Sequence, residues 1–418
     1  MKQHKNIYHI VKANLCVGCG ICEDVCAKHC IQIKLIKGQN IPSLSEKECN
    51  QCGLCLQVCP GKGFQITQQT QKLFGNELQI HKDNHLGYTL ANYAGYSTDH
   101  EIRYHGASGG LVTGLLSYLL RKKIIDGAVV VSFKKENPFS PSTYIARTEE
   151  EIIQSRSSKY CAISYEGIAS EILQKEGKYV VVGLPCHIQA FRNYERISKK
   201  LKERVIGHFA LYCSATKNQD SLHYMMKRYG VDEHSVASFT YRDEGCMGSM
   251  IAKDENGKVL LKKSYLSYYI PLHGFFNLSR CSLCVDHYGE LADVSLGDLQ
   301  IDKYKEDQIG ISSMIIRTNK WHEIIKKAVR DSAIKIESID DELLKSSQMY
   351  AYKHKKGPGI RAAFTIRKKL GLSTPDYDIE LTGYYNYKFV LRELMNYACR
   401  FIGRHPSLWF IIQLLDRK

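Results

Sequence analysis

Eight of the sixteen cysteines in this chain fall into two runs with identical spacing. In each run, three cysteines are separated by two residues, and a fourth follows after three more. The first run is Cys16, Cys19, Cys22 and Cys26, and the second is Cys49, Cys52, Cys55 and Cys59. Two-residue gaps let three thiolates from one short loop reach three corners of a cubane iron–sulfur cluster. The spacing therefore predicts metal-bound thiolates and a protein that transfers electrons.

The three-residue gap predicts that the two runs exchange their last cysteine, as in bacterial-type two-cluster ferredoxins. The first 4Fe-4S cluster would take Cys16, Cys19, Cys22 and Cys59, and the second would take Cys49, Cys52, Cys55 and Cys26. Pro60 follows Cys59, as the pattern expects, whereas Ala27 follows Cys26. Repeated cysteine pairs also make structural zinc sites. Eight cysteines in two matched runs favour iron–sulfur over zinc.

Four more cysteines stand where a thiol would project from a rigid edge. Cys186 follows the apolar segment 178–183 through a Gly/Pro turn, and Cys213 ends the apolar segment 209–212. Cys281 and Cys284 have the spacing of a two-point metal clamp. These four thiolates would satisfy a third cubane cluster, and the alternative is that they are ordinary buried thiols. We interpret the remaining cysteines as ordinary thiols: Cys30, Cys161, Cys246 and Cys399.

A glycine-rich segment precedes a predicted helix over 111–120. Ser108, Gly109 and Gly110 stand directly before it. Glycine lets the backbone approach a ligand closely, and the amides at a helix N-terminus attract phosphate. We therefore interpret the segment as a phosphate-binding turn, with a plain helix start as the alternative. Gly106-x-Ser108-x-Gly110 also spells the nucleophile elbow of hydrolases, but no clear strand precedes it and no partner acid or histidine can be assigned.

Several sequence blocks occur in a fixed order over residues 100–345. They are Ala107 to Gly114, Ser158 to Tyr160, Gly183 to Gln189, and Cys281 through Asp286 to Asp298. Together they resemble the coenzyme F420 hydrogenase/dehydrogenase beta-subunit family, in which an N-terminal ferredoxin module is a common attachment. The resemblance implies a domain that binds FAD and a 4Fe-4S cluster and transfers electrons between them. It places the cluster ligands on Cys186, Cys213, Cys281 and Cys284.

The resemblance also implies flavin contacts in the first two blocks. The residues are Ser108, Gly109, Gly110 and Thr113, followed by Ser158, Lys159 and Tyr160. Lys159 would support charge at flavin N1 or on the phosphates, with a surface lysine as the alternative. Tyr160 would stack on the isoalloxazine or simply pack in the protein.

Three further residues of these blocks could have a role in the site or in the fold. His187 would tune the cluster through a hydrogen bond next to Cys186, or serve only the fold. Asp293 and Asp298 are interpreted as residues that organise turns, because aspartate favours such local hydrogen bonds.

The chain of 418 residues exceeds one ordinary domain, and we expect an α+β protein of four parts. They are a two-cluster ferredoxin domain over 1–66, a linker over 67–100, an α/β domain binding FAD and a 4Fe-4S cluster over 101–345, and a basic, largely helical extension over 346–418. Apolar runs at 128–131 and 178–183, rich in β-branched residues, predict strands of the α/β domain.

The net charge of +15 and the C-terminal extension raise the question of a partner. From about Tyr384, apolar residues recur at helical spacing between arginines. Such a basic amphipathic helix can lie in a membrane interface, and the alternative is a helix that docks on the core. No zinc-finger spacing, RNP-like run or long basic arm favours nucleic acid. Without an export signal or a bilayer-length apolar run, we expect a cytoplasmic protein whose tail can touch the membrane periphery.

These features predict an iron–sulfur flavoprotein oxidoreductase with three 4Fe-4S clusters and FAD. Electrons would pass from the ferredoxin clusters through the third cluster to FAD, and on to a two-electron acceptor such as coenzyme F420 or a biosynthetic metabolite. The alternative is an electron-transfer subunit that serves a redox partner protein and has no substrate of its own. A third hypothesis, a DNA-binding iron–sulfur regulator, predicts salt-sensitive duplex binding and no flavin.

Overall fold

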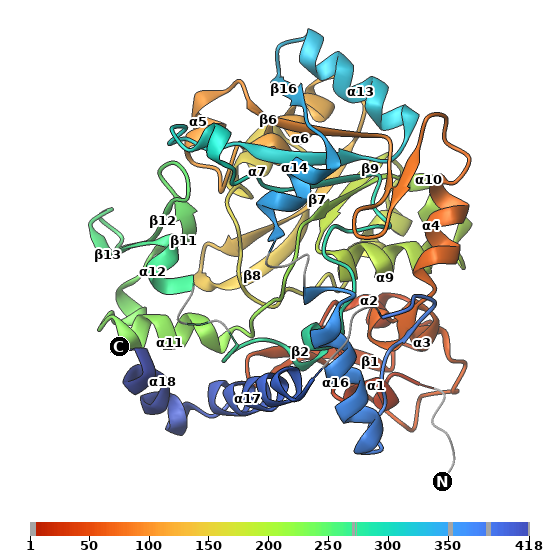
Figure 1. Cartoon of the computed structure of the whole chain (residues 1–418), viewed down its shortest axis with the longest axis vertical. Coiled ribbons are helices and arrows are strands. Elements are labelled where there is room, and N and C mark those ends of the chain that lie inside the picture. The colour runs from red at the N-terminus through yellow and green to blue at the C-terminus, as the bar shows by residue number, and fades with distance from the viewer. Residues whose placement is uncertain (1–5, 270–271, 273, 350–353, 382–385, 417–418) are drawn as a thin grey trace.

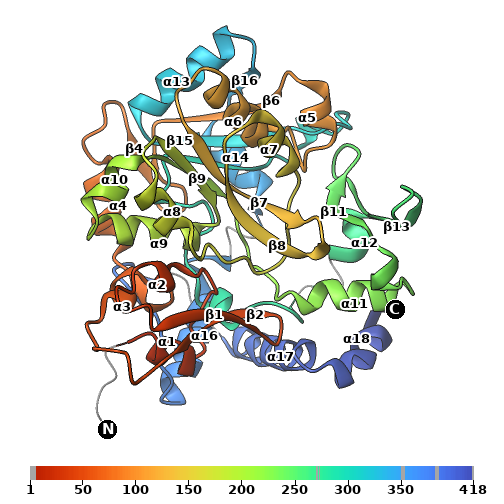
Figure 2. The ribbon, with the colours of Figure 1, turned by 180° about the vertical axis from the view of Figure 1, so that it is seen from behind.

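The computed structural model describes residues 6–269, 272, 274–349, 354–381 and 386–416. An eight-stranded mixed sheet with helices on both faces occupies its centre (Figure 1). The cysteine-rich N-terminal unit and the last helices of the chain lie together below this sheet in both views (Figures 1 and 2). The mixed α/β architecture agrees with the expected fold class.

The sheet has the strand order β16-β6-β15-β14-β10-β9-β7-β8. Its strands are β6 (Ala91–Ser97), β7 (Gly127–Lys134), β8 (Asn137–Ala146), β9 (Tyr179–Gly183), β10 (Val205–Leu211), β14 (Val294–Asp298), β15 (Ser312–Ile316) and β16 (Ile334–Ser338). The four adjacent strands β14, β10, β9 and β7 run parallel, and the remaining strands pair antiparallel. The strands predicted at 128–131 and 178–183 are confirmed as β7 and β9.

Helices bury the two faces of the sheet separately. One face is covered by α6 (Leu111–Arg121), α7 (Glu149–Gln154) and α13 (Asn319–Arg330), and the other by α8 (Ile168–Gln174), α9 (Pro185–Glu195) and α10 (Lys199–Arg204). In β9, Val180 and Val182 pack on the first face and Val181 on the second, as the two-residue period of a strand requires. The helix predicted over 111–120 is confirmed as α6.

The N-terminal unit shares its core with the large domain. Its elements are α1 (Tyr8–Lys12), α2 (Ile21–Asp24), the antiparallel pair β1 (Ile31–Ile36) and β2 (Gln39–Leu44), and α3 (Leu54–Val58). Its buried side chains belong to the same apolar cluster as α8 and α9. The Asp24 carboxylate accepts hydrogen bonds from the amides of Gly167 (2.9 Å) and Ala169 (3.1 Å) at the start of α8. The unit is therefore fixed against the large domain.

Residues 67–100, expected to be a linker, are largely structured. They hold most of α4 (Ile66–Phe74), the pair β4 (His81–Asp83) and β5 (Gly87–Thr89), strand β6, and the start of α5 (His100–Tyr104). β6 lies inside the main sheet between β15 and β16, so the linker prediction is wrong for it. Its segment Asn92-Tyr93-Ala94-Gly95-Tyr96-Ser97 contains no β-branched residue, and Asn92, Ala94 and Gly95 are depleted in strands, which weakened the strand signal of its two tyrosines.

A smaller sheet stands beside the main one. It consists of β11 (Ser238–Asp243), β12 (Ser249–Lys253) and β13 (Val259–Ser264), with α11 (Asp220–Arg228) and α12 (Tyr265–Tyr269) nearby. Its inner residues join the core cluster of the large domain.

The C-terminal extension is helical and docks on the rest of the chain. The end of α14 (Asp341–Ser347) leads into the extension. The extension then contains α16 (Pro358–Lys369), β17 (Asp376–Tyr377), α17 (Tyr387–Gly403) and α18 (Trp409–Asp416). β17 pairs with β3 (Gly63–Phe64) at the end of the N-terminal unit. Trp409 and Ile412 are buried, which confirms the docking alternative for the tail. Among the described residues, no helix is both long and apolar enough to cross a bilayer.

Candidate functional site

The first predicted ligand set of the N-terminal unit lies together. Burial, together with the nearby Cys59 thiol, raises the pKa of the Cys16 thiol to about 12. Cys59 acts in the same way on the pKa of Cys19 and Cys22. The last cysteine of the second run therefore lies among the first three of the first run, as the interlocked pattern predicts.

The second predicted set has an additional neighbour. The Sγ atoms of Cys26 and Cys30 are 3.4 Å apart. Burial raises the pKa of Cys30 to about 12, and Cys26 and Cys49 contribute to this shift. Cys30 thus lies against two predicted ligands, although its spacing gave no sign of it. In the described parts of the chain, no three His, Cys, Asp or Glu side chains converge as a site for a single metal ion.

The four cysteines outside the N-terminal unit line one chamber. Cys186 lies in the first turn of α9 directly after β9, and Cys213 follows β10 by two residues. Because β9 and β10 are parallel neighbours, their ends bring these two thiols to one edge of the sheet. Cys281 lies in a short 3-10 helix, Ser279–Leu283, and Cys284 directly follows it. Val17, Pro60 and Phe64 of the N-terminal unit also line the chamber.

Charge and burial in this chamber suit thiolate ligands. Burial raises the pKa of Cys186, and Cys213, Cys284, Cys19 and Cys281 add to that shift. Cys19 belongs to the first ligand set, so the two sets of thiols are close neighbours. Buried thiols that repel each other as thiolates gain from a cationic metal centre that replaces their protons. An all-sulfur donor set is also the set that iron–sulfur clusters use.

Three buried cations surround the chamber, and sequence reasoning missed all of them. They are Lys217, Arg280 and Lys355. The Arg280 guanidinium donates to the carbonyl oxygens of Pro60 (3.2 Å) and Gly61 (3.3 Å) and to the Tyr377 hydroxyl (2.6 Å). It therefore connects the turn after Cys59 with the segment that carries Cys281. Only its position next to Cys281 in the sequence could have marked Arg280 in advance.

The C-terminal extension contributes directly to this chamber. Lys355 and Tyr377 both line it. Burial lowers the pKa of Lys355, but Cys284, Cys213 and Cys281 outweigh this, so its pKa is raised. The Tyr377 hydroxyl also donates to the carbonyl oxygen of Leu283 (3.2 Å). Nothing in the sequence indicated that a basic tail would supply the wall of a buried site.

Hydrogen bonds to Ile311 and Ser312 hold the turn that is predicted to bind phosphate. The Ser108 hydroxyl donates to the carbonyl oxygen of Ile311 (2.7 Å), and the Gly109 amide donates to the Ser312 hydroxyl (3.0 Å). A Cβ atom at Gly109 would lie 2.5 Å from the carbonyl oxygen of Gly95, so this glycine allows the turn to pack on β6. Gly110 begins α6 with φ 69°, and Thr113 is buried one turn later.

The second predicted flavin block lies on a turn that its own lysine stabilises. The Lys159 ammonium donates to the carbonyl oxygens of Arg156 (2.6 Å) and Ser157 (3.0 Å), and also to that of Ser155. Burial lowers the pKa of Lys159 to about 7. Lys159 is partly buried, and its contacts are with the backbone that presents Ser158 and Tyr160.

Arg242 links the two sequence blocks that are predicted to bind flavin. Its guanidinium donates to Asp298 (2.6 Å) and to the Tyr160 hydroxyl (3.3 Å). Asp298 pairs across the strands with Ser312, which holds Gly109. Arg242 is 1% exposed, and its Nη2 has no hydrogen-bond partner within the described residues. Asp298 is therefore an ion-pair partner, which corrects its interpretation as a turn residue.

His187 lies in the first turn of α9, next to Cys186. Its Nδ1 accepts a hydrogen bond from the Leu184 amide (3.2 Å) at the start of α9. Burial lowers the pKa of His187 to about 4, so the ring is neutral at neutral pH. These contacts favour the interpretation that His187 serves only the fold.

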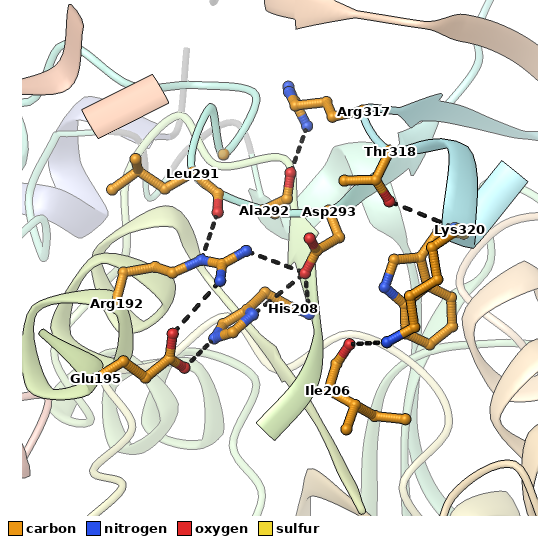
Figure 3. Close-up of polar contacts among 12 residues, drawn as sticks. Arg192, Glu195, Ile206, His208, Leu291, Ala292, Asp293, Arg317, Thr318 and Lys320 are labelled. Atoms are coloured by element: carbon orange, nitrogen blue, oxygen red, sulfur yellow. Dashed lines mark hydrogen bonds and ion pairs between the residues drawn. The ribbon is translucent and has the colours of Figure 1, made fainter. Parts of the chain in front are cut away.

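A buried ion network fixes the elements that carry the chamber cysteines (Figure 3). His208 of β10 contacts Glu195 of α9 (2.6 Å) and Asp293 before β14 (3.2 Å). Arg192 contacts the same two carboxylates, at 3.4 and 3.1 Å, and donates to the carbonyl oxygen of Leu291 (3.0 Å). Asp293 is thus the centre of an ion network, which corrects its assignment to a turn.

The network predicts a pH-dependent contribution to stability. Burial and Arg192 lower the pKa of His208, but Glu195 and Asp293 outweigh them, so its pKa is raised. A raised histidine pKa stabilises the fold fully below the unfolded value of about 6.5, and this contribution is lost as pH rises through the folded value. The melting temperature of His208→Gln should therefore fall furthest below wild type near pH 6 and least near about pH 9. An equal difference across that range would contradict this account.

Three models of known protein families match parts of this chain. Residues 92–168 match the family model for the coenzyme F420 hydrogenase/dehydrogenase beta subunit N-terminus, and residues 176–342 match the model for its C-terminus. The chain belongs to this family. Residues 15–62 match a 4Fe-4S dicluster domain, which supports iron–sulfur over zinc for the N-terminal cysteines. The C-terminal residues that line the chamber, Lys355 and Tyr377, lie outside these matched ranges.

Several similar proteins carry names that refer to coenzyme F420. The coenzyme F420-dependent sulfite reductase of Methanocaldococcus jannaschii is 27% identical over 79% of this chain, but the match spans only 48% of that protein. The coenzyme F420 hydrogenase subunit beta of Methanothermobacter thermautotrophicus is 29% identical over 67% of this chain and 95% of its own length. A chain of the F420-reducing NiFe hydrogenase complex from Methanosarcina barkeri shares the fold, with a TM-score of 0.55 and 23% identity over 71% of this chain and 98% of that chain.

Proposed function

We propose that this family member is an iron–sulfur flavoprotein oxidoreductase with three 4Fe-4S clusters and FAD. Two clusters would belong to the ferredoxin unit, and Cys186, Cys213, Cys281 and Cys284 would bind the third. Iron–sulfur clusters move single electrons, and a flavin exchanges one or two with an acceptor. The observation that carries the proposal is the chamber in which these four thiols meet Val17, Pro60 and Phe64 of the ferredoxin unit.

The protein supports electron transfer at this chamber by proximity and charge. Cys19 lies close enough to Cys186 to raise the pKa of its thiol. Arg280 holds the turn after Cys59 against the segment of Cys281 through its bonds to Pro60 and Gly61. Buried cations beside a thiolate-bound centre favour its more negative, reduced form. We infer that Lys217, Arg280 and Lys355 make the chamber a favourable place for an electron.

An aromatic wall leads from the chamber to the predicted flavin residues. The Lys217 ammonium lies 4.0 Å from the centroid of the Tyr269 ring, and the Tyr269 and Tyr160 centroids are 4.9 Å apart. Tyr160 in turn contacts Arg242. The buried guanidinium of Arg242, with Nη2 unpartnered in the described residues, suits an anionic part of a flavin. Arg242 would thus bind FAD with Ser108, Gly109, Gly110, Thr113, Ser158 and Tyr160, and Lys159 would position the second block.

Replacing Arg242 with methionine should reduce bound flavin about tenfold or more, because a charged hydrogen bond to the ligand is lost. Arg242→Lys keeps the charge and should retain more flavin. Both variants should keep the iron content of the wild type, since Arg242 is not among the residues that line the cysteine chamber. Flavin would be measured by absorbance after release from the anaerobically purified protein. A fully flavinated Arg242→Met protein would show that the flavin binds elsewhere.

The names of the relatives favour coenzyme F420 as the two-electron acceptor. They also support the alternative that this chain is an electron-transfer subunit of a larger enzyme. The relatives of Methanothermobacter and Methanosarcina carry names of F420 hydrogenase subunits. The purified chain separates the two alternatives. An enzyme in its own right should exchange electrons between a reduced ferredoxin-type donor and F420 without any added protein. A relay subunit should reduce its clusters and flavin but leave F420 unchanged until a partner is supplied.

A further inference from the structure

The last two helices of the chain have one buried and one exposed apolar face. On the inner side, the Trp409 ring packs against Tyr224 (5.6 Å between centroids) and Phe276 (5.9 Å), and Ile412 is buried beside it. The Trp409 indole also donates to the carbonyl oxygen of Gly403 (3.0 Å). These contacts hold α17 and α18 on the body of the protein. Docking therefore uses only one side of the two helices.

The outer side presents large apolar side chains to solvent. Nine such residues, each at least 53% exposed, lie in these two helices: Tyr387, Leu391, Leu394, Met395, Tyr397, Phe401, Phe410, Leu414 and Leu415. They make up nine of the nineteen exposed large hydrophobic residues in the described chain. An exposed apolar patch of this kind marks an interaction surface. We call it the tail face.

The charges around the tail face have one sign. Lys388 and Arg392 are exposed on α17. Lys368 and Lys369 are exposed at the end of α16, just before the exposed Leu370, and α16 lies beside α17 at the lower end of the molecule (Figures 1 and 2).

Acidic side chains are nearly missing from these helices. The acids of these two helices are Glu393, which is largely buried and paired with Arg400 at 2.8 Å, and Asp416, the last residue of α18. The tail face is therefore apolar with a cationic border.

We propose that the tail face binds the surface of an anionic lipid bilayer and holds the protein there as a peripheral membrane protein. Helices that lie in a membrane interface combine leucine and aromatic side chains with lysine and arginine at the edge. A cationic border adds attraction to acidic headgroups. The scarcity of acidic residues in these two helices favours a lipid surface over a protein interface, which commonly pairs charges of both signs. This inference is independent of the proposed electron path.

Co-sedimentation with vesicles tests the proposal on the intact, cluster-loaded chain. The protein should sediment with vesicles of phosphatidylglycerol and phosphatidylcholine, bind pure phosphatidylcholine weakly, and dissociate as salt rises. A triple variant, Leu391→Ser with Leu394→Ser and Phe401→Ser, should bind at least about tenfold less, because the buried apolar area is lost. Lys368→Gln with Lys369→Gln should weaken binding to acidic vesicles alone.

A matched control removes exposed apolar side chains elsewhere. Leu35 and Ile36 are 59% and 48% exposed on the ferredoxin hairpin, and Leu35→Ser with Ile36→Ser should leave vesicle binding unchanged. Iron content and melting temperature of all variants report whether they fold. Failure of the wild type to sediment with acidic vesicles would overturn the proposal, as would equal binding by the triple variant. A dimer in light scattering that the triple variant abolishes, without vesicle binding, would instead assign the tail face to a second copy of this chain.

Discussion

Replacing Cys284 with serine should slow electron transfer from the ferredoxin unit to the flavin by orders of magnitude. Cys284 is one of four thiols that line the chamber next to the ferredoxin unit. Serine offers oxygen in place of the soft thiolate that iron–sulfur clusters use, so the third cluster should be lost or impaired. In rapid anaerobic mixing with a low-potential donor, the ferredoxin clusters should still be reduced promptly. The absorbance of oxidised FAD should then decay far more slowly than in the wild type.

A second cysteine provides the control for this experiment. Cys399 lies on α17 and does not line the chamber, so Cys399→Ser should transfer electrons at the wild-type rate. A chemical hydride donor that reaches the flavin directly should reduce it in both variants. A wild-type rate in Cys284→Ser would show that this cysteine pair is structural. The flavin would then have to exchange electrons with the ferredoxin unit directly.

Replacing Asp293 with asparagine should destabilise the large domain more than any surface substitution. Asp293 contacts both Arg192 and His208, and burial leaves these cations few other partners (Figure 3). The cations hold the pKa of Asp293 well below its usual range. Removing one partner from a buried ion network typically costs about 3–5 kcal/mol. The apparent melting temperature under anaerobic conditions should therefore fall by several degrees.

The position of this network gives Asp293→Asn a second expected effect. Arg192 and Glu195 lie on the helix that begins at Cys186, and His208 lies on the strand that leads to Cys213. Loosening these elements should lower the iron retained by the chamber before the ferredoxin clusters are affected. Asp331→Asn is a suitable control, because Asp331 forms an exposed pair with Lys122 and should change stability little. Equal melting temperatures for the two variants would contradict the role of the network.

The sequence predicts those parts of the protein in which metal binding restricts the spacing of the residues. Three cysteines at two-residue gaps allow few arrangements, and the structure brings Cys59 to the first run as that pattern requires. Parallel strands explain why Cys186 and Cys213, which are far apart in the sequence, meet at one sheet edge. Runs of valine likewise identify β7 and β9.

Other parts depend on long-range contacts that leave no local pattern. Strand β6 forms inside the sheet although Gly95 and Ala94 are poor strand formers, because its neighbours on both sides supply the hydrogen bonds. Lys355 and Tyr377 look like solvated tail residues in the sequence, and only folding of the extension against Arg280 reveals their place. From the sequence, the tail could either dock on the core or contact a membrane. It has one buried and one exposed apolar face, which explains why the sequence carried the pattern of both alternatives.

Iron and acid-labile sulfide analysis of the anaerobically purified chain tests the central claim most directly. Three 4Fe-4S clusters predict about twelve iron and about twelve sulfide per chain. About eight of each would contradict a third cluster on Cys186, Cys213, Cys281 and Cys284.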